Sequence, residues 1–304
     1  MHALTLAKRN FNIGCVTHPS KNLPPTSQLF IYPSNPAMNS PLPSPAVEPS
    51  SSNAIRFSFT ADIPQAAPSN PPAGDCWDVK ATECQAERVA ALRLVHQVYA
   101  QAGLTAERPQ AMRVMRHHLS DQTQILIAKR GQEVMLTGTL VGDAEYGMPL
   151  ESLFADEVAA MRSAGLKLGE ISCLASDLGL HDKKERFERL VTLISLIFQT
   201  ARRRGMDRLL LAVHPRHAKI YQRLFGCVPC SDVKQYAAVQ GNPAVMCMHD
   251  FKQLDACRYP LYHKMYGEQY PPWKLDGGRM TAAEKAYFSS FCLDQASELL
   301  SVGA

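Results

Sequence analysis

The chain has 304 residues and a formal net charge of +4 at neutral pH, and 46% of its residues are hydrophobic. This length and composition allow a sizeable buried core in one or two domains. The mild net charge gives no argument for a nucleic acid partner. No apolar run reaches the roughly 18 residues of a transmembrane helix, so no membrane span is expected.

The cysteines indicate a reducing compartment. They number nine, which is odd, and they are scattered along the chain. A domain of this length needs no disulfide framework. Lys8 and Arg9 are followed by no apolar segment, so a secretory signal is not expected. We therefore expect a cytoplasmic protein with reduced thiols.

Residues 1–74 are expected to form a disordered leader rich in Pro and Ser. Residues 16–53 contain many Pro, Ser and Asn with few aliphatic residues, and residues 63–74 have a similar composition. Such segments bury too little apolar surface to offset the entropy lost on ordering. Residues 54–62 alternate well enough for a strand, but this strand has no evident partner.

From Trp77 onward, helical and strand periodicities follow each other along the chain. Apolar residues at helical spacing predict helices over residues 83–101, 149–165, 186–204 and 217–226. Strand-like runs cover residues 122–130, 133–142, 168–176, 207–213, 235–239 and 244–251. The first two of these strands are joined at Arg130-Gly131-Gln132, which predicts a hairpin.

This order of elements predicts one α/β domain over residues 75–255, with a mixed sheet and helices on both faces. Residues 256–304 form a C-terminal extension. It begins with a sequence rich in Tyr and Pro and ends in a predicted helix over 281–301. Folding back onto the domain and mediating association both stay open for this extension.

Three stretches of the domain are distinctive when they are read together. They are GTLVGDAEYGMPLESLF (138–154), LGEISCLAS (168–176) and AVHPRHAKIYQRLFG (212–226), the last with GNPAV (241–245) behind it. In this order they resemble the N-acyl amino acid synthases and, more distantly, the acyl-homoserine-lactone synthases. The resemblance covers residues 77–251. It implies a GNAT-like, mostly antiparallel sheet, an acyl carrier protein thioester as donor and a free amino acid as acceptor.

The segment before the long helix bears on the donor. Coenzyme A-using members of the GNAT fold usually carry R/Q-x-x-G-x-G/A there, where backbone amides bind a pyrophosphate. The corresponding SDLGLHDKKERF (176–187) lacks this pattern. We therefore expect a carrier-bound acyl-phosphopantetheine thioester as donor substrate, and no other cofactor.

A basic cluster follows directly, at the place where the resemblance implies that the donor enters. Its members are Lys183, Lys184, Arg186 and Arg189. Carrier proteins are acidic, so these residues are predicted to steer carrier docking. A solvated helix face is the alternative interpretation.

Two residues are the predicted catalytic groups. Glu170 lies within an apolar, alternating strand, where lost hydration should raise its pKa and suit it to act as general base. The homoserine-lactone synthases have a functional Glu in a similar E-x-S context, followed by an Arg where this chain has Cys173. Tyr221 matches the tyrosine that many GNAT enzymes use to protonate the leaving sulfur. A structural ion pair or an exposed strand end for Glu170, and simple packing for Tyr221, are the alternatives.

Further residues are predicted to contact substrate. Asp143 and Glu145 follow a strand expected to border the acceptor pocket, and they either pair with the substrate ammonium or only solvate a turn. Ser172 of the E-x-S motif is expected to line the same pocket. His217 lies one helical turn before Tyr221 and is expected to cap the helix or line the acyl site. No ligand cluster at suitable spacing supports a metal site.

The sequence therefore predicts an N-acyltransferase that moves a long-chain acyl group from acyl carrier protein to an amino acid. One alternative is an acyl-homoserine-lactone-type synthase, which the absence of Arg at position 173 disfavours. The other is a non-catalytic module that binds carrier protein or an acyl chain. A shared cleft for Glu170 and Tyr221 would favour the enzyme, and side chains on opposite faces of the sheet would favour the binding module.

Overall fold

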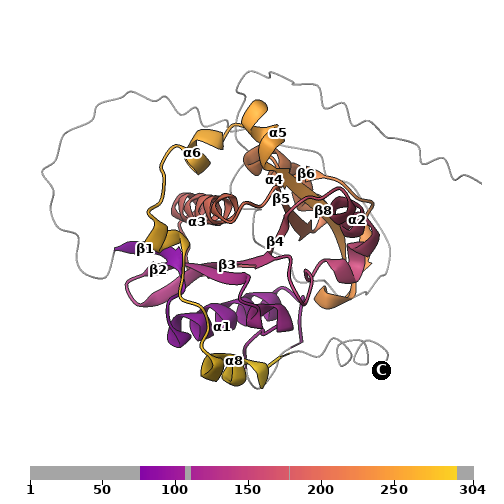
Figure 1. Ribbon diagram of the computed structural model, residues 1–304. Coiled ribbons are helices and arrows are strands. Elements are labelled where there is room, and N and C mark those ends of the chain that lie inside the picture. The colour runs from indigo at the N-terminus through magenta and orange to yellow at the C-terminus, as the bar shows by residue number, and fades with distance from the viewer. Residues whose placement is uncertain (1–75, 107–110, 178, 293–304) are drawn as a thin grey trace, which may run out of the picture.

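The computed structural model describes residues 76–106, 111–177 and 179–292 (Figure 1). The predicted leader over residues 1–74 and the strand at 54–62 lie outside the described residues, as does the end of the predicted helix 281–301.

The described chain forms eight strands, eight α-helices and two 3-10 turns. The strands are β1 (Trp77–Ala81), β2 (Thr123–Arg130), β3 (Glu133–Gly142), β4 (Leu168–Ser176), β5 (Arg208–Val213), β6 (Val228–Pro229), β7 (Lys234–Tyr236) and β8 (Asn242–Asp250). The helices are α1 (Gln85–Gln101), α2 (Glu151–Ser163), α3 (Lys183–Arg203), α4 (Pro215–Phe225), α5 (Phe251–Ala256), α6 (Tyr262–Tyr266), α7 (Pro272–Leu275) and α8 (Ala282–Ser289). The 3-10 turns cover Arg116–Leu119 and Ala237–Val239.

The strands form one mixed sheet in the order β1-β2-β3-β4-β5-β8-β6, with β7 also paired to β8. All pairs are antiparallel except β4 with β5. The predicted hairpin joins β2 and β3, and Gly131 in its turn has φ 61°, a conformation that favours glycine. The sheet confirms the predicted fold class.

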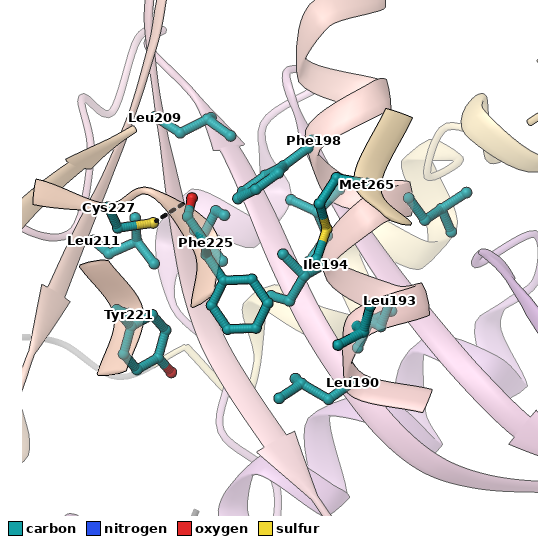
Figure 2. Close-up of a cluster of buried hydrophobic side chains, with 14 of the residues drawn as sticks. Leu190, Leu193, Ile194, Phe198, Leu209, Leu211, Tyr221, Phe225, Cys227 and Met265 are labelled. Atoms are coloured by element: carbon teal, nitrogen blue, oxygen red, sulfur yellow. Dashed lines mark hydrogen bonds between the residues drawn. The ribbon is translucent and has the colours of Figure 1, made fainter. Parts of the chain in front are cut away.

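Helices cover both faces of the sheet (Figure 1). The long helix α3 lies on one face, above β1 to β4, and α1 and α8 lie on the other. The largest core cluster forms under α3 and includes Phe198 and Ile194 of the helix with the sheet residues Leu209 and Leu211 (Figure 2). A separate cluster joins Phe154 of α2 to Leu210 of β5.

The C-terminal extension folds back onto the domain. Met265 of α6 is fully buried beside Phe198 of α3 (Figure 2). Leu275 of α7 belongs to the same core cluster, and Phe288 of α8 packs with residues of α1 and β2. The described residues beyond 255 therefore complete the core of the same body.

Several short elements differ from the sequence prediction, including the unpredicted two-residue β6. Residues 237–239 were expected to continue a strand, but they form a 3-10 turn that ends at Gln240 with φ 57°. The edge strand β1 was not predicted, because its five residues directly follow the Pro-rich leader and are too short to show a clear period.

Candidate active site

A cavity opens where β4 and β5 stop pairing. The parallel ladder between them covers only Leu168–Glu170 with Arg208–Leu210. Both strands continue past this point, and their residues 171–174 and 211–213 line opposite sides of a cavity of about 140 Å³. Helix α4 and the segments 113–117 and 236–244 complete the lining. The site therefore lies within the sheet, at the gap between two separating strands.

Glu170 is the last residue of β4 that pairs with β5, and it lines this cavity. Its side chain is 2% exposed, and Oε2 accepts a hydrogen bond from the backbone amide of Leu150 at 2.8 Å. Burial raises the pKa of Glu170 to about 8, against the opposing effects of the Leu150 amide and the Ser172 hydroxyl. A carboxyl group with this pKa can exchange a proton near neutral pH.

A bulge in β4 lies three residues after Glu170. Thr137 of β3 pairs with Ala175, but Thr139 pairs with Ser172, so β4 has one extra residue in this interval. Cys173 adopts φ 52°, which is unusual for a residue other than glycine. Neither Cys173 nor Leu174 is paired in the register with β3. The bulge thus interrupts the register of β4 close to the candidate base.

Helix α4 brings Tyr221 and His217 to the same cavity. The helix begins with Pro215, its cap His214 accepts a hydrogen bond from the Arg216 amide, and it ends at Gly226 with φ 66°. The capping role expected for His217 therefore falls to His214. Burial, with the charges of Arg216 and His214, lowers the pKa of His217 to about 4, so this imidazole is neutral at pH 7.

Glu170 and Tyr221 come from opposite faces of the sheet and line one cavity. Side chains alternate along a strand, and Ile171 packs in the cluster under α3, so Glu170 points to the other face. Tyr221 belongs to the cluster under α3, at its edge, with its hydroxyl pointing away from Cys227 (Figure 2). Because β4 and β5 separate here, the cavity is open to both faces. We expected Glu170 and Tyr221 either to share a cleft or to lie on opposite faces of the sheet. In the structure they line one cavity and approach it from opposite faces.

Arg113 is a cavity residue that the sequence analysis did not identify. It is 4% exposed, its Nη2 donates to the carbonyl oxygen of Ala238 at 2.9 Å, and its guanidinium lies 5.3 Å from the Tyr99 ring centroid. Its charge and a hydrogen bond from it lower the pKa of the Cys173 thiol, although burial raises that pKa overall. An arginine from the segment before β2 thus lies beside the cysteine that replaces the Arg of the homoserine-lactone synthases.

Tyr236 was also missed. It lines the cavity, and its hydroxyl donates to the carbonyl oxygen of Pro149 at 3.1 Å. Burial and the nearby carboxyl of Glu170 raise the pKa of Tyr236, so the phenol stays protonated. No periodicity in the sequence signals either Arg113 or Tyr236, because both lie in irregular or very short elements.

The structure does not bring Asp143 and Glu145 to the cavity. Both carboxylate oxygens of Asp143 accept hydrogen bonds from Arg162, at 2.6 and 2.7 Å. Glu145 is exposed and accepts from the Ser120 hydroxyl at 3.2 Å. Their positions therefore fit an ion pair and a solvated turn. Ser172, in contrast, lines the cavity as expected and forms a hydrogen bond with Glu170.

The four basic residues predicted for carrier docking divide into two pairs. Lys183 and Lys184 are exposed at the start of α3. Arg186 donates through Nε and Nη2 to the carbonyl oxygen of Leu180, and the guanidinium of Arg189 lies 5.2 Å from the Trp77 ring centroid. The two arginines therefore hold local structure, and the two lysines are the members of the cluster that are open to a partner.

Comparison with known protein families shows to which family the chain belongs. The family of the N-acyl amino acid synthase FeeM matches residues 90–250, which is more than half of the chain. The chain belongs to this family. It is an acyltransferase, and the resemblance inferred from its sequence is confirmed.

One solved structure agrees in fold. FeeM, an N-acyl amino acid synthase from uncultured soil microbes, has 23% sequence identity and a TM-score of 0.53, over 62% of this chain and 97% of FeeM. Weaker matches include an acyl-CoA N-acyltransferase from Pseudomonas aeruginosa, with 17% identity and TM-score 0.40 over 57% of this chain and 99% of that one. The acyl-homoserine-lactone synthase LasI has 13% identity and TM-score 0.45, over 65% of this chain and 100% of LasI. No curated protein sequence matches this chain.

Among the described residues, no three His, Cys, Asp or Glu side chains gather closely enough to hold a metal ion. In the same part of the chain, no helix combines the length and apolar content that crossing a bilayer requires.

Proposed function

We propose that this synthase-family member transfers a long-chain acyl group from an acyl carrier protein thioester to the amine of an amino acid. The observation that carries the proposal is the shared cavity of Glu170 and Tyr221, a carboxyl group of raised pKa and a phenol on its two sides. A cytoplasmic location belongs to the proposal, because acyl carrier protein and free amino acids are both available there.

The two groups supply the proton transfers that amide formation needs. Glu170 accepts a proton from the substrate ammonium, and the neutral nitrogen attacks the thioester carbonyl carbon. The backbone amides of Cys173 and Leu174 are the nearest candidates to stabilise the oxyanion. The carbon–sulfur bond then breaks, Tyr221 protonates the departing sulfur, and the second proton lost by the nitrogen restores the phenol. The products are the amide, the carrier thiol and one proton released to solvent.

The start of α3 supports a donor without a pyrophosphate. Asp182 caps this helix, and its Oδ1 accepts from the amides of Lys184 at 2.8 Å and Glu185 at 3.3 Å. These are the amides that would otherwise bind a phosphate group at a helix N-terminus. The carboxylate occupies them and repels a second anion. A carrier-bound phosphopantetheine has no pyrophosphate and therefore does not need these amides.

Lipid analysis of cells that express the chain tests the proposal. We expect new masses of long-chain N-acyl amino acids that are absent from cells expressing Glu170→Gln. Acyl-homoserine lactones as the main product would instead establish the first alternative. If the wild-type chain accumulates to high level without any new acyl amide, the non-catalytic module is the better account.

A further inference from the structure

We propose that Arg113 binds the carboxylate of the acceptor and thereby restricts the substrate class to α-amino acids. This inference rests on the proposed function and identifies the group in the cavity that would recognise an amino acid and reject a simple amine. In this proposal Arg113 acts in binding the acceptor, whereas Glu170 and Tyr221 act in the acyl transfer itself.

Arg113 places a positive charge inside the cavity. Arg113 and Arg116 are the two Lys or Arg side chains among the described residues that line the cavity. Arg116 is exposed, but Arg113 is 4% exposed. His217, on the far side, is neutral at pH 7 because its pKa lies near 4. A carboxylate inside this cavity needs a cation, since an unpaired buried charge is costly. Arg113 is such a cation, and it is buried in the cavity wall.

Arg113 is held in a defined orientation. Its Nη2 donates to the Ala238 carbonyl oxygen at 2.9 Å, and its guanidinium faces the Tyr99 ring at 5.3 Å from the centroid. The planar guanidinium presents several N–H groups that match the two oxygens of a carboxylate. A side chain fixed in this way loses little rotamer freedom when a carboxylate binds.

Glu170, Cys173 and Arg113 all line this one cavity, and Glu170 and Cys173 are three residues apart on β4. The charge of Arg113 lowers the pKa of the Cys173 thiol, and the carboxyl of Glu170 raises it. The pKa of the Tyr236 phenol is likewise raised by Glu170 and lowered by Arg113. In an α-amino acid, a single carbon joins the amine to the carboxylate. An acceptor whose amine faces Glu170 can therefore direct its carboxylate across Cys173 toward Arg113.

The experiment compares three acceptors for each amino acid that the wild type acylates: the free acid, its carboxamide and the decarboxylated amine. Wild-type kcat/KM should be highest for the acid. Arg113→Met should reduce kcat/KM for the acid by about 10²-fold, the usual cost of removing one partner of a buried charge pair. The values for the carboxamide and the amine should change little, so the preference for the acid disappears. The loss should appear mainly in KM for the acid.

Two matched variants complete the test. Arg93→Met removes an exposed arginine of α1 outside the cavity and should keep the wild-type preference. Arg116→Met removes the exposed cation of the cavity and should keep most of the preference. If Arg113→Met does not fold, Arg113→Lys decides, because it keeps the charge and loses the planar geometry. We expect it to raise KM for the acid alone.

Each outcome has a separate meaning. If the wild type acylates no amino acid, the proposed function fails before Arg113 is in question. If the wild type acylates amino acids and the folded Arg113 variants still prefer the acid over its carboxamide, the role of Arg113 is wrong. Loss of the preference in Arg116→Met alone would also overturn it, because the carboxylate would then lie at the exposed arginine.

Discussion

The carboxylate of Glu170 accepts a hydrogen bond from the backbone amide of Leu150 at 2.8 Å, inside a site that leaves the side chain 2% exposed. The amide favours the charged form, and burial opposes it. Burial is the larger effect, so the pKa of Glu170 rises to about 8. The residue is therefore mostly protonated at pH 7 in the free protein and gains its base form as the pH increases.

The first prediction is the pH dependence of acyl transfer. Because only the carboxylate accepts a proton, kcat/KM should rise with pH, with a midpoint near the pKa of Glu170 of about 8. In Glu170→Gln the midpoint of this rise should shift to higher pH, to the pKa of the substrate amine. An unchanged midpoint in that variant would assign the titration to the substrate and remove Glu170 from the base role.

The second prediction concerns stability. Between pH 4.5 and about 8 the folded state holds a proton on Glu170 that the unfolded state has lost. The free energy of unfolding must therefore fall as pH rises through this window. Glu170→Gln lacks this contribution, so Tm of the wild type minus Tm of the variant should decrease from about pH 5 to 8 and then level off. Scanning calorimetry of both proteins over this pH range measures the difference in Tm. A constant difference would mean that the pKa of Glu170 is close to that of an exposed carboxyl.

The third prediction addresses Tyr221. Tyr221→Phe keeps the ring in the core cluster and removes the hydroxyl, so folding should persist while kcat falls by about 10²-fold or more. An aryl thioester leaves without protonation, so this donor should restore most of the rate. Tyr236→Phe is the matched control, since that phenol also lines the cavity but donates to Pro149. A loss in Tyr221→Phe that is the same for alkyl and aryl thioesters would contradict the acid role.

The fourth prediction separates the two pairs of the basic cluster. Lys183→Glu with Lys184→Glu should raise KM for the acyl carrier protein, and the effect should shrink at high salt, since exposed charges are screened over about 10 Å at 0.1 M. KM for a small acyl-pantetheine thioester should stay unchanged. Arg93→Glu with Lys252→Glu reverses two other exposed cations and serves as the charge control. Equal losses in both double variants would mean that net charge, and not a docking site, is responsible.

Much of the fold was predictable because its periodic segments are long. The strand over 168–176 was predicted with its observed bounds, and the long helix was placed within three residues of Lys183–Arg203. The short β1 and β6 were not predicted, since five and two residues show no reliable period. The packing of the extension was also left open, because Met265 and Leu275 become core residues only through long-range contacts.

The candidate site was predictable only in part, because long-range contacts decide which side chains reach the cavity. Glu170 was identified because a carboxylate in an apolar strand is conspicuous in the sequence, and the structure buries it at the cavity. Asp143 was expected at the acceptor pocket, but its partner Arg162 lies on α2, and no local pattern indicates that pair. Arg113 could not be placed, because its proximity to Cys173 depends on how the segment before β2 crosses the sheet.

The most direct test is a reconstituted assay with purified protein, a long-chain acyl carrier thioester and a mixture of amino acids. Mass spectrometry would quantify the amide, and a thiol reagent the free carrier. We predict one free carrier thiol for each N-acyl amino acid with the wild type, and a rate lower by about 10²–10⁴ with folded Glu170→Gln. Thiol release without amide, or a folded Glu170→Gln within about threefold of wild type, well below that range, would contradict the account.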